Sequence, residues 1–185
     1  MILRNVIRAS QTLAERLDSP VCCIYQHNDA FPGSHPLFVG PLGYNGSKAA
    51  MELIKQADVV LALGTRLNPF STLPGYNLDY WPNEAKLIQV DINPDRIGLT
   101  KPVTVGIVGD SKQVAEQILS RLTDSAGDAG RDVRRKLIAD KKAVWAKTLA
   151  SMDFEEDDPG TTWNERVRKR QPDHMSPRMV WRAIM

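Results

Sequence analysis

Asp58-Val-Val-Leu-Ala-Leu-Gly64 decides the fold of this 185-residue chain, because it is a short, almost wholly apolar run that ends in glycine. Such a run is typical of a β-strand that is buried on both faces of a parallel sheet. Two later stretches repeat the pattern, Lys86-Leu-Ile-Gln-Val-Asp-Ile92 and Val103-Thr-Val-Gly-Ile-Val-Gly109. Together the three runs predict a domain of the α/β class.

Helical periodicity separates the predicted strands. Apolar residues at spacings of three and four predict amphipathic helices over residues 3–17, from Ser47 to Ala57, and after Asp110. Pro20-Val-Cys-Cys-Ile24 predicts a short strand behind the first helix. Strands that alternate with helices indicate a doubly wound, mostly parallel sheet, Rossmann-like in architecture. A charged helix over residues 131–152 and an extended tail are predicted to follow.

A long connection, residues 25–46, separates the short strand from the second helix, and we predict that it has no regular structure. It contains two of the three histidines, together with three prolines and four glycines. Loops of this length are uncommon in compact domains and usually have a function. His27 and His35, with Asp29, could ligate a metal ion, but loop histidines more often line a pocket. We therefore predict no metal site.

The composition is that of a globular protein and disfavours two classes of partner. Apolar residues make up 42% of the chain, yet no apolar run approaches the ~20 residues of a membrane span. The net charge is only +2, so no nucleic-acid surface is indicated. Cys22 and Cys23 are adjacent in a strand and point to opposite faces. We expect reduced thiols and hence a cytoplasmic location.

Ligands of an open α/β sheet collect at the carboxyl ends of its strands, where three candidate segments lie. They contain Gly64, Arg66, Asp91, Asn93, Gly109 and Asp110. Glycine admits a ligand close to the backbone, arginine can bind a phosphate through two N–H groups, and a carboxylate can accept from ribose hydroxyls. These residues predict a nucleotide or pyrophosphate cleft. The alternative is that Asp91 and Asp110 are turn or helix-cap residues and that Arg66 forms a structural ion pair.

Five motifs follow one another in a fixed order. They are Phe31-Pro-Gly-Ser-His-Pro-Leu37, Gly40-Pro-Leu-Gly-Tyr-Asn-Gly46, Ala57-Asp-Val-Val-Leu-Ala-Leu-Gly-Thr-Arg66, Gln89-Val-Asp-Ile-Asn-Pro-Asp-Arg-Ile-Gly98 and Val108-Gly-Asp110. Together they resemble the central domain of thiamine-diphosphate enzymes of the acetohydroxyacid synthase type. Within this family, residues 25–36 and 67–76 closely resemble members of taurine and sulfonate metabolism. Those members convert sulfoacetaldehyde and phosphate to acetyl phosphate and sulfite.

The resemblance implies a division of the chain. Residues 1–124 are expected to be a central α/β domain that lacks its first strand. Residues 125–174 are expected to be a linker with the charged helix and an extended segment, and residues 175–185 the start of a truncated diphosphate-binding domain. The family's activating glutamate and metal-binding motif have no counterpart in this sequence. We therefore expect a fragment that is inactive alone and contains no catalytic residue.

The resemblance also implies cofactors, partners and a pocket wall. Thiamine diphosphate and Mg²⁺ are expected in the full-length enzyme, with ligands outside this chain and in the thiamine-binding domains. FAD is not expected, and an ADP-like nucleotide is the candidate for the central cleft. A homodimer or homotetramer is implied for the full-length enzyme. The pocket-wall candidates, which would contact substrate or phosphate, are His27, Asn28, Phe31, His35, Tyr44 and Asn45.

Two alternatives remain open at this point. The first is a stand-alone nucleotide-binding or scaffold α/β module. The second is the central domain of an enzyme closer to the acetohydroxyacid synthases. Those enzymes carry acidic residues and a second arginine at the position of Asn68-Pro-Phe70, and this departure weakens the second alternative.

Overall fold

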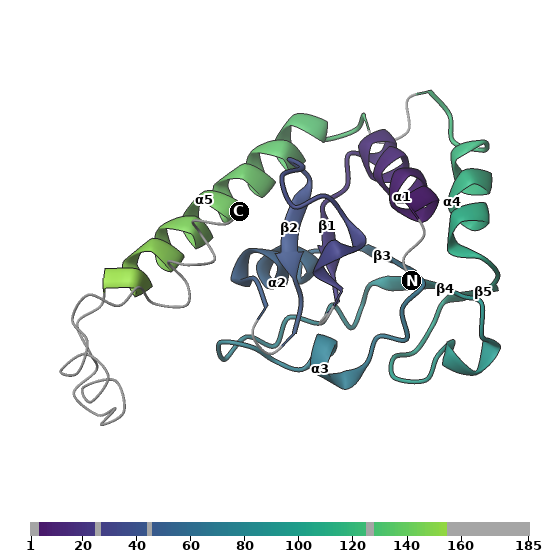
Figure 1. Cartoon of the computed structure of the whole chain (residues 1–185), viewed down its shortest axis with the longest axis horizontal. Helices are drawn as coiled ribbons and strands as arrows, with labels where there is room; N and C mark the ends of the chain where they lie inside the picture. The colour runs from purple at the N-terminus through teal and green to yellow at the C-terminus, as the bar shows by residue number, and fades with distance from the viewer. Residues whose placement is uncertain (1–3, 25–26, 44–45, 125–127, 155–185) are drawn as a thin grey trace. The chain divides into compact units, whose positions relative to one another are not determined.

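The computed structural model describes residues 4–24, 27–43, 46–124 and 128–154. The chain forms two compact units, Met1–Lys142 and Ala143–Met185, and the described part of the second is the end of the last helix. The helices are α1 (Arg4–Leu17), α2 (Lys48–Ile54), α3 (Pro69–Thr72), α4 (Ser111–Leu119) and α5 (Arg131–Phe154) (Figure 1). Among these helices, none has the length and apolar character needed to cross a bilayer.

The described strands form two parallel sheets. One pairs β1 (Val21–Cys23) with β2 (Phe38–Pro41), and the other has the order β3 (Val59–Leu63), β4 (Lys86–Asp91) and β5 (Val105–Val108). The middle strand β4 is the most buried of the three. This agrees with its predominantly apolar sequence, which is typical of a strand covered on both faces. The predicted α/β class is confirmed, and the described strands fall into two sheets rather than one.

The prediction that residues 25–46 lack regular structure is wrong. A 3₁₀ turn, η1 (Asn28–Ala30), lies near the start of this segment, and β2 lies near its end. The sequence does not predict β2, because glycine and proline are poor strand residues. In the structure, Gly40 has a φ of +98°, and Pro41 has no N–H group to donate. Such residues are tolerated in a short strand at the edge of a sheet, where one side needs no partner. Phe38 pairs with Val21 and Pro41 with Cys23.

The connection between β3 and β4 contains the one-turn helix α3. Asn68 caps this helix, because its Oδ1 atom accepts a hydrogen bond from the Ser71 backbone at 3.0 Å. Close approach to the first loop depends on Gly43, since a Cβ atom there would lie 2.2 Å from the Phe70 carbonyl oxygen. The segment before α2 and the connection after β3 therefore pack directly on each other.

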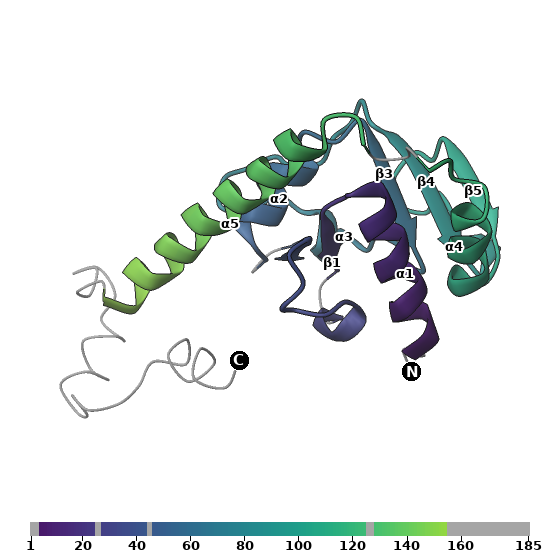
Figure 2. The same ribbon diagram turned by 90° about the horizontal axis from the view of Figure 1, so that it is seen from above.

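Helix α1 packs on both sheets. Its Ala14 lies in one apolar cluster with Cys23 of β1 and Val39 of β2. Ala9 and Leu13 lie in a second cluster, which includes the α4 residue Ala115 and the packed side chains Leu61 and Leu63 of β3. Figures 1 and 2 show α1 beside α4, so the two helices cover the same face of the larger sheet.

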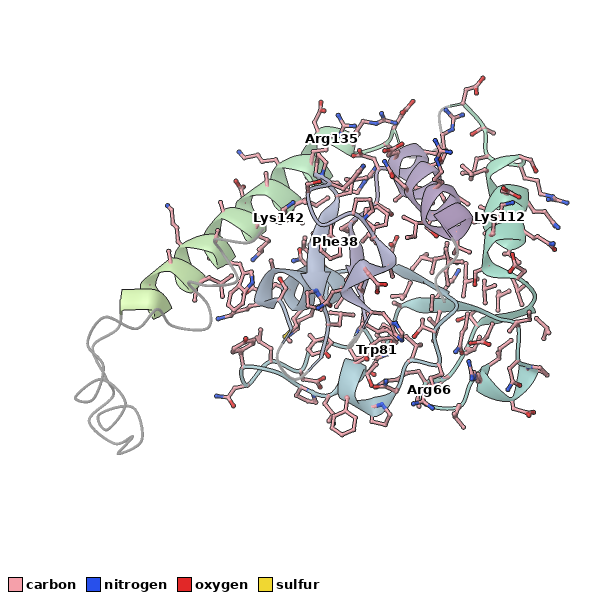
Figure 3. The ribbon with its side chains drawn as sticks, viewed as in Figure 1. Phe38, Arg66, Trp81, Lys112, Arg135 and Lys142 are labelled. Atoms are coloured by element: carbon pink, nitrogen blue, oxygen red, sulfur yellow. The ribbon has the colours of Figure 1, made fainter. Side chains whose placement is uncertain are left out.

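The first half of α5 packs into the first compact unit. Ile138 is buried in the cluster that contains β1 and β2. Lys141 forms an ion pair with Glu52 of α2 at 2.7 Å, and Lys142 donates to the Pro36 carbonyl at 3.1 Å (Figure 3). The predicted boundary between residues 124 and 125 stays a prediction. The predicted segments beyond residue 154 lie outside the described residues.

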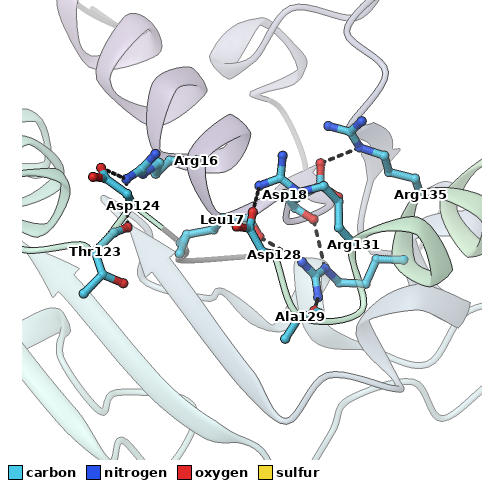
Figure 4. A network of polar contacts seen from close by, with 10 residues as sticks. Arg16, Leu17, Asp18, Thr123, Asp124, Asp128, Ala129, Arg131 and Arg135 are labelled. Atoms are coloured by element: carbon cyan, nitrogen blue, oxygen red, sulfur yellow. Dashed lines mark hydrogen bonds and ion pairs between the residues drawn. The ribbon is translucent and has the colours of Figure 1, made fainter.

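A polar network fixes the start of α5 to the end of α1 (Figure 4). Asp18 is buried, has a φ of +52°, and accepts from Nε of Arg135 at 2.8 Å. Arg134 donates to the carbonyl oxygens of Leu17, the last residue of α1, and of Asp18, which follows it. Helix α1 thus ends against guanidinium groups that satisfy its free carbonyls and complement its dipole.

We expect Ile138→Ala to lower the free energy of unfolding by about 2–4 kcal/mol, because it leaves a cavity in the core. The matched control is Val133→Ala on the same helix, where the side chain is 73% exposed and the expected change is below ~0.5 kcal/mol. Urea denaturation of both variants measures the difference. Equal stabilities would show that α5 does not belong to the core of the first unit.

Candidate functional site

The turn η1 and the N-cap residue before it present two of the predicted pocket-wall residues to solvent. His27 and Asn28 are exposed, whereas Phe31 directly behind them is 3% exposed. The Phe31 ring stacks with Phe38 at a centroid distance of 6.0 Å and meets the His35 ring edge-on at 5.2 Å. The buried Phe31 ring, with the two rings packed against it, therefore anchors the turn. The other two candidates, Tyr44 and Asn45, lie outside the described residues.

His35 has partners at both ring nitrogens. Its Nδ1 atom accepts from the Leu37 backbone N–H at 3.2 Å, and its Nε2 atom lies 3.0 Å from Glu15 Oε1. Because Nδ1 accepts, the neutral ring carries its proton on Nε2 and donates it to the carboxylate. The pKa of Glu15 is lowered by a hydrogen bond from Gln11 and then by this one. His35 thus ties the loop to α1, which leaves His27 and Asn28 as the polar candidates.

The parallel pairing brings the predicted cleft segments to one edge of the larger sheet. Gly64 donates its N–H to the Val90 carbonyl at 2.8 Å, and Gly109 donates to the Asp91 carbonyl at 3.0 Å. Gly64 has a φ of +64°, and a Cβ atom there would lie 2.9 Å from Oγ of Ser111 in the first turn of α4. The ends of β3, β4 and β5 therefore meet beside the start of that helix.

The carboxylates at this edge accept hydrogen bonds from backbone N–H groups. Asp91 is 2% exposed, and its Oδ1 atom accepts from the Asn93 N–H at 2.9 Å. Asp110 caps α4, since its Oδ1 atom accepts from the backbones of Lys112 and Gln113 at 3.0 Å each. Both acidic residues therefore have the turn and helix-cap roles that were the alternative to ligand binding. Asn93 also caps a turn, the 3₁₀ helix η2 (Pro94–Arg96).

Arg66 differs from the two carboxylates because its side chain has no fixed partner. Arg66 is exposed, and its guanidinium forms no ion pair with any of the described residues (Figure 3). Its backbone is fixed, because the Thr100 hydroxyl donates to the carbonyls of Arg66 and Leu67. A guanidinium on a fixed backbone, beside the exposed backbone of Gly64, is suited to bind an anion.

Gln89 is the residue at this edge that the sequence analysis missed. Its side chain is 1% exposed, and its Nε2 atom donates to the carbonyls of Thr65 at 2.9 Å and Arg96 at 3.0 Å. Its Oε1 atom accepts from the Gly98 N–H at 2.9 Å. One buried amide therefore joins the turn after β3 to the loop after β4. The signal in the sequence was a single amide between the apolar residues Ile88 and Val90 of β4.

The two cysteine thiols are not activated as nucleophiles, and the described residues contain no metal cluster. Burial raises the pKa of the Cys22 thiol to about 12 and that of Cys23 to about 11, which disfavours the thiolate. Burial likewise raises the pKa of Tyr80 to about 12, and its hydroxyl donates to the Ser71 carbonyl at 3.0 Å. In the described residues, no three His, Cys, Asp or Glu side chains gather to hold a metal.

We expect Gln89→Met to reduce the free energy of unfolding by about 2–4 kcal/mol, because it leaves two carbonyls and one N–H without partners. Gln89→Glu keeps only the acceptor for Gly98. When the new carboxyl at position 89 is protonated, it regains one donor for a carbonyl. The folded state therefore favours the protonated form, so the pKa of this carboxyl is higher in the folded protein than in the unfolded chain. The free energy of unfolding of this variant should therefore increase as the pH falls. Urea denaturation across pH, with amide exchange at Gly98, measures both effects. Thr100→Val is the control, because Thr100 holds the same turn but does not bond to Gly98. If the Gly98 amide lost its protection from exchange in Thr100→Val and kept it in the Gln89 variants, the role assigned to Gln89 would be wrong.

Comparison with known proteins identifies the family. Residues 2–118 match the model of the thiamine pyrophosphate enzyme central domain. The chain is 71% identical over its whole length to sulfoacetaldehyde acetyltransferase of Roseovarius nubinhibens, of which it covers 30%. It is 67% identical over its whole length to the protein of the same name from Rhodobacter capsulatus, of which it covers 31%.

A more distant relative, a probable acetolactate synthase large subunit of Methanocaldococcus jannaschii, is 38% identical over 60% of the chain. The chain spans about a third of the length of the curated relatives that match all of it. Both the parallel-stranded α/β fold and the matched model point to one family. The chain belongs to the thiamine pyrophosphate enzymes, and residues 2–118 form the central domain of that family.

Proposed function

We propose that the chain is the central domain of a thiamine-diphosphate-dependent acyltransferase that converts sulfoacetaldehyde and phosphate to acetyl phosphate and sulfite. The supporting observation is a contrast between relatives. Those named sulfoacetaldehyde acetyltransferase, one of them as probable, match the whole chain, three of them at 67–71% identity. Those named acetolactate synthase match 60–78% of it at 28–38% identity. The contrast favours the acyltransferase over an acetohydroxyacid-synthase-like enzyme.

Thiamine diphosphate supplies the carbanion chemistry of this reaction when it is bound with Mg²⁺. The described residues offer no cluster of metal-ligating side chains for a magnesium diphosphate. We therefore assign both cofactors to other parts of the full-length enzyme and derive no chemical step from this chain. The absence of FAD, a homodimer or homotetramer, and a cytoplasmic location remain predictions for that enzyme.

The contribution proposed for this chain is one wall of the substrate pocket. His27 and Asn28 are exposed on a turn whose base is fixed by Phe31 and by the His35–Glu15 contact. An imidazole N–H and a carboxamide N–H can both donate to the oxygens of a sulfonate or a phosphate. Because the turn is anchored from below, these donors are held in place before the anion binds, which reduces the entropy cost of binding.

In the full-length enzyme, we expect Asn28→Ala to raise the KM for sulfoacetaldehyde or for phosphate by roughly 10-fold, the effect of one hydrogen bond to a charged group. The melting temperature should not change, because the residue is exposed. Sulfite release from sulfoacetaldehyde in the presence of phosphate measures the activity. Ser34→Ala, exposed in the same loop, is the matched control.

The same assay tests the proposed reaction. The isolated 185-residue chain should release no sulfite, whereas the full-length enzyme should release sulfite and form acetyl phosphate. An enzyme that decarboxylates pyruvate and releases no sulfite would refute the acyltransferase proposal. It would favour the acetohydroxyacid-synthase-like alternative.

A second candidate function is nucleotide binding at the edge formed by the ends of β3, β4 and β5. The favouring observation is that Arg66 is exposed and has no ion pair in the described residues, beside the exposed backbone of Gly64. Asp91 is a poor ribose ligand here, because it is 2% exposed and binds the Asn93 backbone. The site proposed is therefore an anion site for a diphosphate group, with Gly109 and Asp110 lining its far side.

We expect ADP to raise the melting temperature of the full-length enzyme by several degrees at saturation and Arg66→Ala to remove most of this shift. FAD and coenzyme A serve as comparison ligands in the same thermal-shift measurement. Arg121→Ala is the control, since Arg121 is an exposed arginine beyond the end of α4. If no ligand shifts the wild-type melting temperature, the nucleotide proposal fails and the acyltransferase proposal is unaffected.

A further inference from the structure

We propose that the larger sheet carries a binding site for a small organic anion with a flat apolar body, such as an aromatic carboxylate. The site is a cavity of about 170 Å³ at the amino-terminal ends of β3 and β4. Gly64 and the candidate nucleotide cleft lie at the other end of these strands. The proposal is therefore independent of both the proposed reaction and the nucleotide site.

The alternation of side chains along β3 decides which face of the sheet holds the cavity. Leu61 and Leu63 pack in the cluster that α1 and α4 share, so Val60 and Ala62 point to the opposite face. Val60 lines the cavity together with Leu87, and each is the second residue of its strand. The floor of the cavity is therefore aliphatic and belongs to the face that α1 and α4 do not cover.

The walls of the cavity come from the two connections of the larger sheet. Trp81, Pro82 and Ala85 belong to the connection between β3 and β4, and Pro102 belongs to the connection between β4 and β5. Trp81 is fixed by packing in the apolar cluster of this face, whose members all come from strands and connections. Proline rings also restrict the backbone. The cavity therefore has flat walls of limited mobility.

The volume of the cavity limits the size of its ligand. A cavity of about 150 Å³ lined by apolar side chains is large enough to bind benzene. A cavity of about 170 Å³ can therefore hold one six-membered ring with its polar group at the mouth. A flat ring beside Trp81 would gain an aromatic contact in addition to the burial of its apolar surface.

Lys101 supplies a positive charge beside the cavity. Its Nζ atom lies 5.0 Å from the centroid of the Trp81 ring, which is a cation–π contact (Figure 3 labels Trp81). In the part of the chain that the structure describes, Lys101 forms no ion pair. The ring thus holds the ammonium in place and leaves its charge available to an anion.

Two neutral donors complete the polar part of the site. The indole N–H of Trp81 and the side-chain amide of Asn83 both belong to lining residues, and neither has an acceptor among the described residues. None of the described residues that line the cavity is acidic. An apolar cavity with a few donors and no carboxylate is suited to a ligand that has an anionic end.

Benzoate is the probe, and benzyl alcohol is its neutral control with the same ring. We expect benzoate to bind the 185-residue chain with a dissociation constant of roughly 0.1–1 mM, the range for a ligand of about nine non-hydrogen atoms. Benzyl alcohol should bind at least ~10-fold more weakly, because it lacks the charge. The measurement is the NMR signal of the Trp81 indole N–H, which is assigned by its loss in Trp81→Phe.

Three lysine variants test the charge. Lys101→Met should weaken benzoate binding roughly 10-fold, because it removes the ammonium and keeps a side chain of similar length. Lys101→Arg should restore binding, since a guanidinium also stacks on an aromatic ring. Lys86→Met is the matched control, because Lys86 is exposed and its side chain points to the other face of β4 from Leu87. This control should bind benzoate as the wild type does.

One further variant tests the cavity without changing any charge. Ala85→Leu places a larger apolar side chain at the wall, and we expect it to abolish the binding of benzoate because the space is filled. Circular dichroism and the melting temperature establish whether this variant is folded. The lysine variants decide the question if it is not.

Three results would overturn the proposal. The first is a Trp81 indole signal that does not move at benzoate concentrations far above the expected dissociation constant. The second is equal affinity for benzoate and benzyl alcohol, or equal affinity of the wild type and Lys101→Met. The third comes from calorimetry, if the full-length enzyme fails to bind benzoate although the 185-residue chain binds it. The sulfite assay is a separate measurement, so failure of the proposed reaction would leave this site unaffected.

Discussion

The apolar face of α1 is the constraint on which the rest of the first unit depends. Parallel strands require crossover helices, and this helix contacts both sheets through residues less than two turns apart, Ala9, Leu13 and Ala14. Its C-terminal end is fixed in turn by Asp18, Arg134 and Arg135, which attach the first half of α5. The loop that holds the pocket-wall candidates is tied to α1 as well, through His35 and Glu15. Displacing this one helix would uncover both sheets and release both attachments.

The polar side chains at the carboxyl edge of the larger sheet are mostly engaged with backbone. Gln89 joins two loops, Asp91 closes a turn, Asp110 caps α4, and Thr100 holds the turn that contains Arg66. Buried polar groups need partners, so these residues serve the loops before they can serve a ligand. What remains for a ligand is the exposed backbone at Gly64 and the guanidinium of Arg66. The edge is therefore suited to an anion and poorly suited to a sugar hydroxyl.

The sequence predicted α1, α2, α4 and α5 and the three strands of the larger sheet, because periodicity and apolar runs are local signals. It did not predict the one-turn helix α3. It did not reveal β2, since Gly40 and Pro41 are poor strand residues whose pairing with β1 depends on tertiary context. The same limit applies to the site. Glu15 lies 20 residues from His35 in the sequence, and the three partners of Gln89 lie 24, 7 and 9 residues away. The contacts that connect separate segments therefore cannot be read from neighbouring residues. The packing of Ile138 was missed for a similar reason, because an amphipathic helix in a linker has the same pattern. The family, by contrast, was recognisable, since its motifs are loop sequences at strand ends.

The strand pairing decides where the candidate cleft lies. Ligands of an open α/β sheet collect at the carboxyl ends of its strands, and Gly64 and Gly109 directly follow β3 and β5 at that edge. The turn after β3 is held by the buried amide of Gln89, which belongs to β4, and by the hydroxyl of Thr100. The position of Arg66 therefore depends on a buried side chain of the neighbouring strand as well as on the residues that would contact an anion.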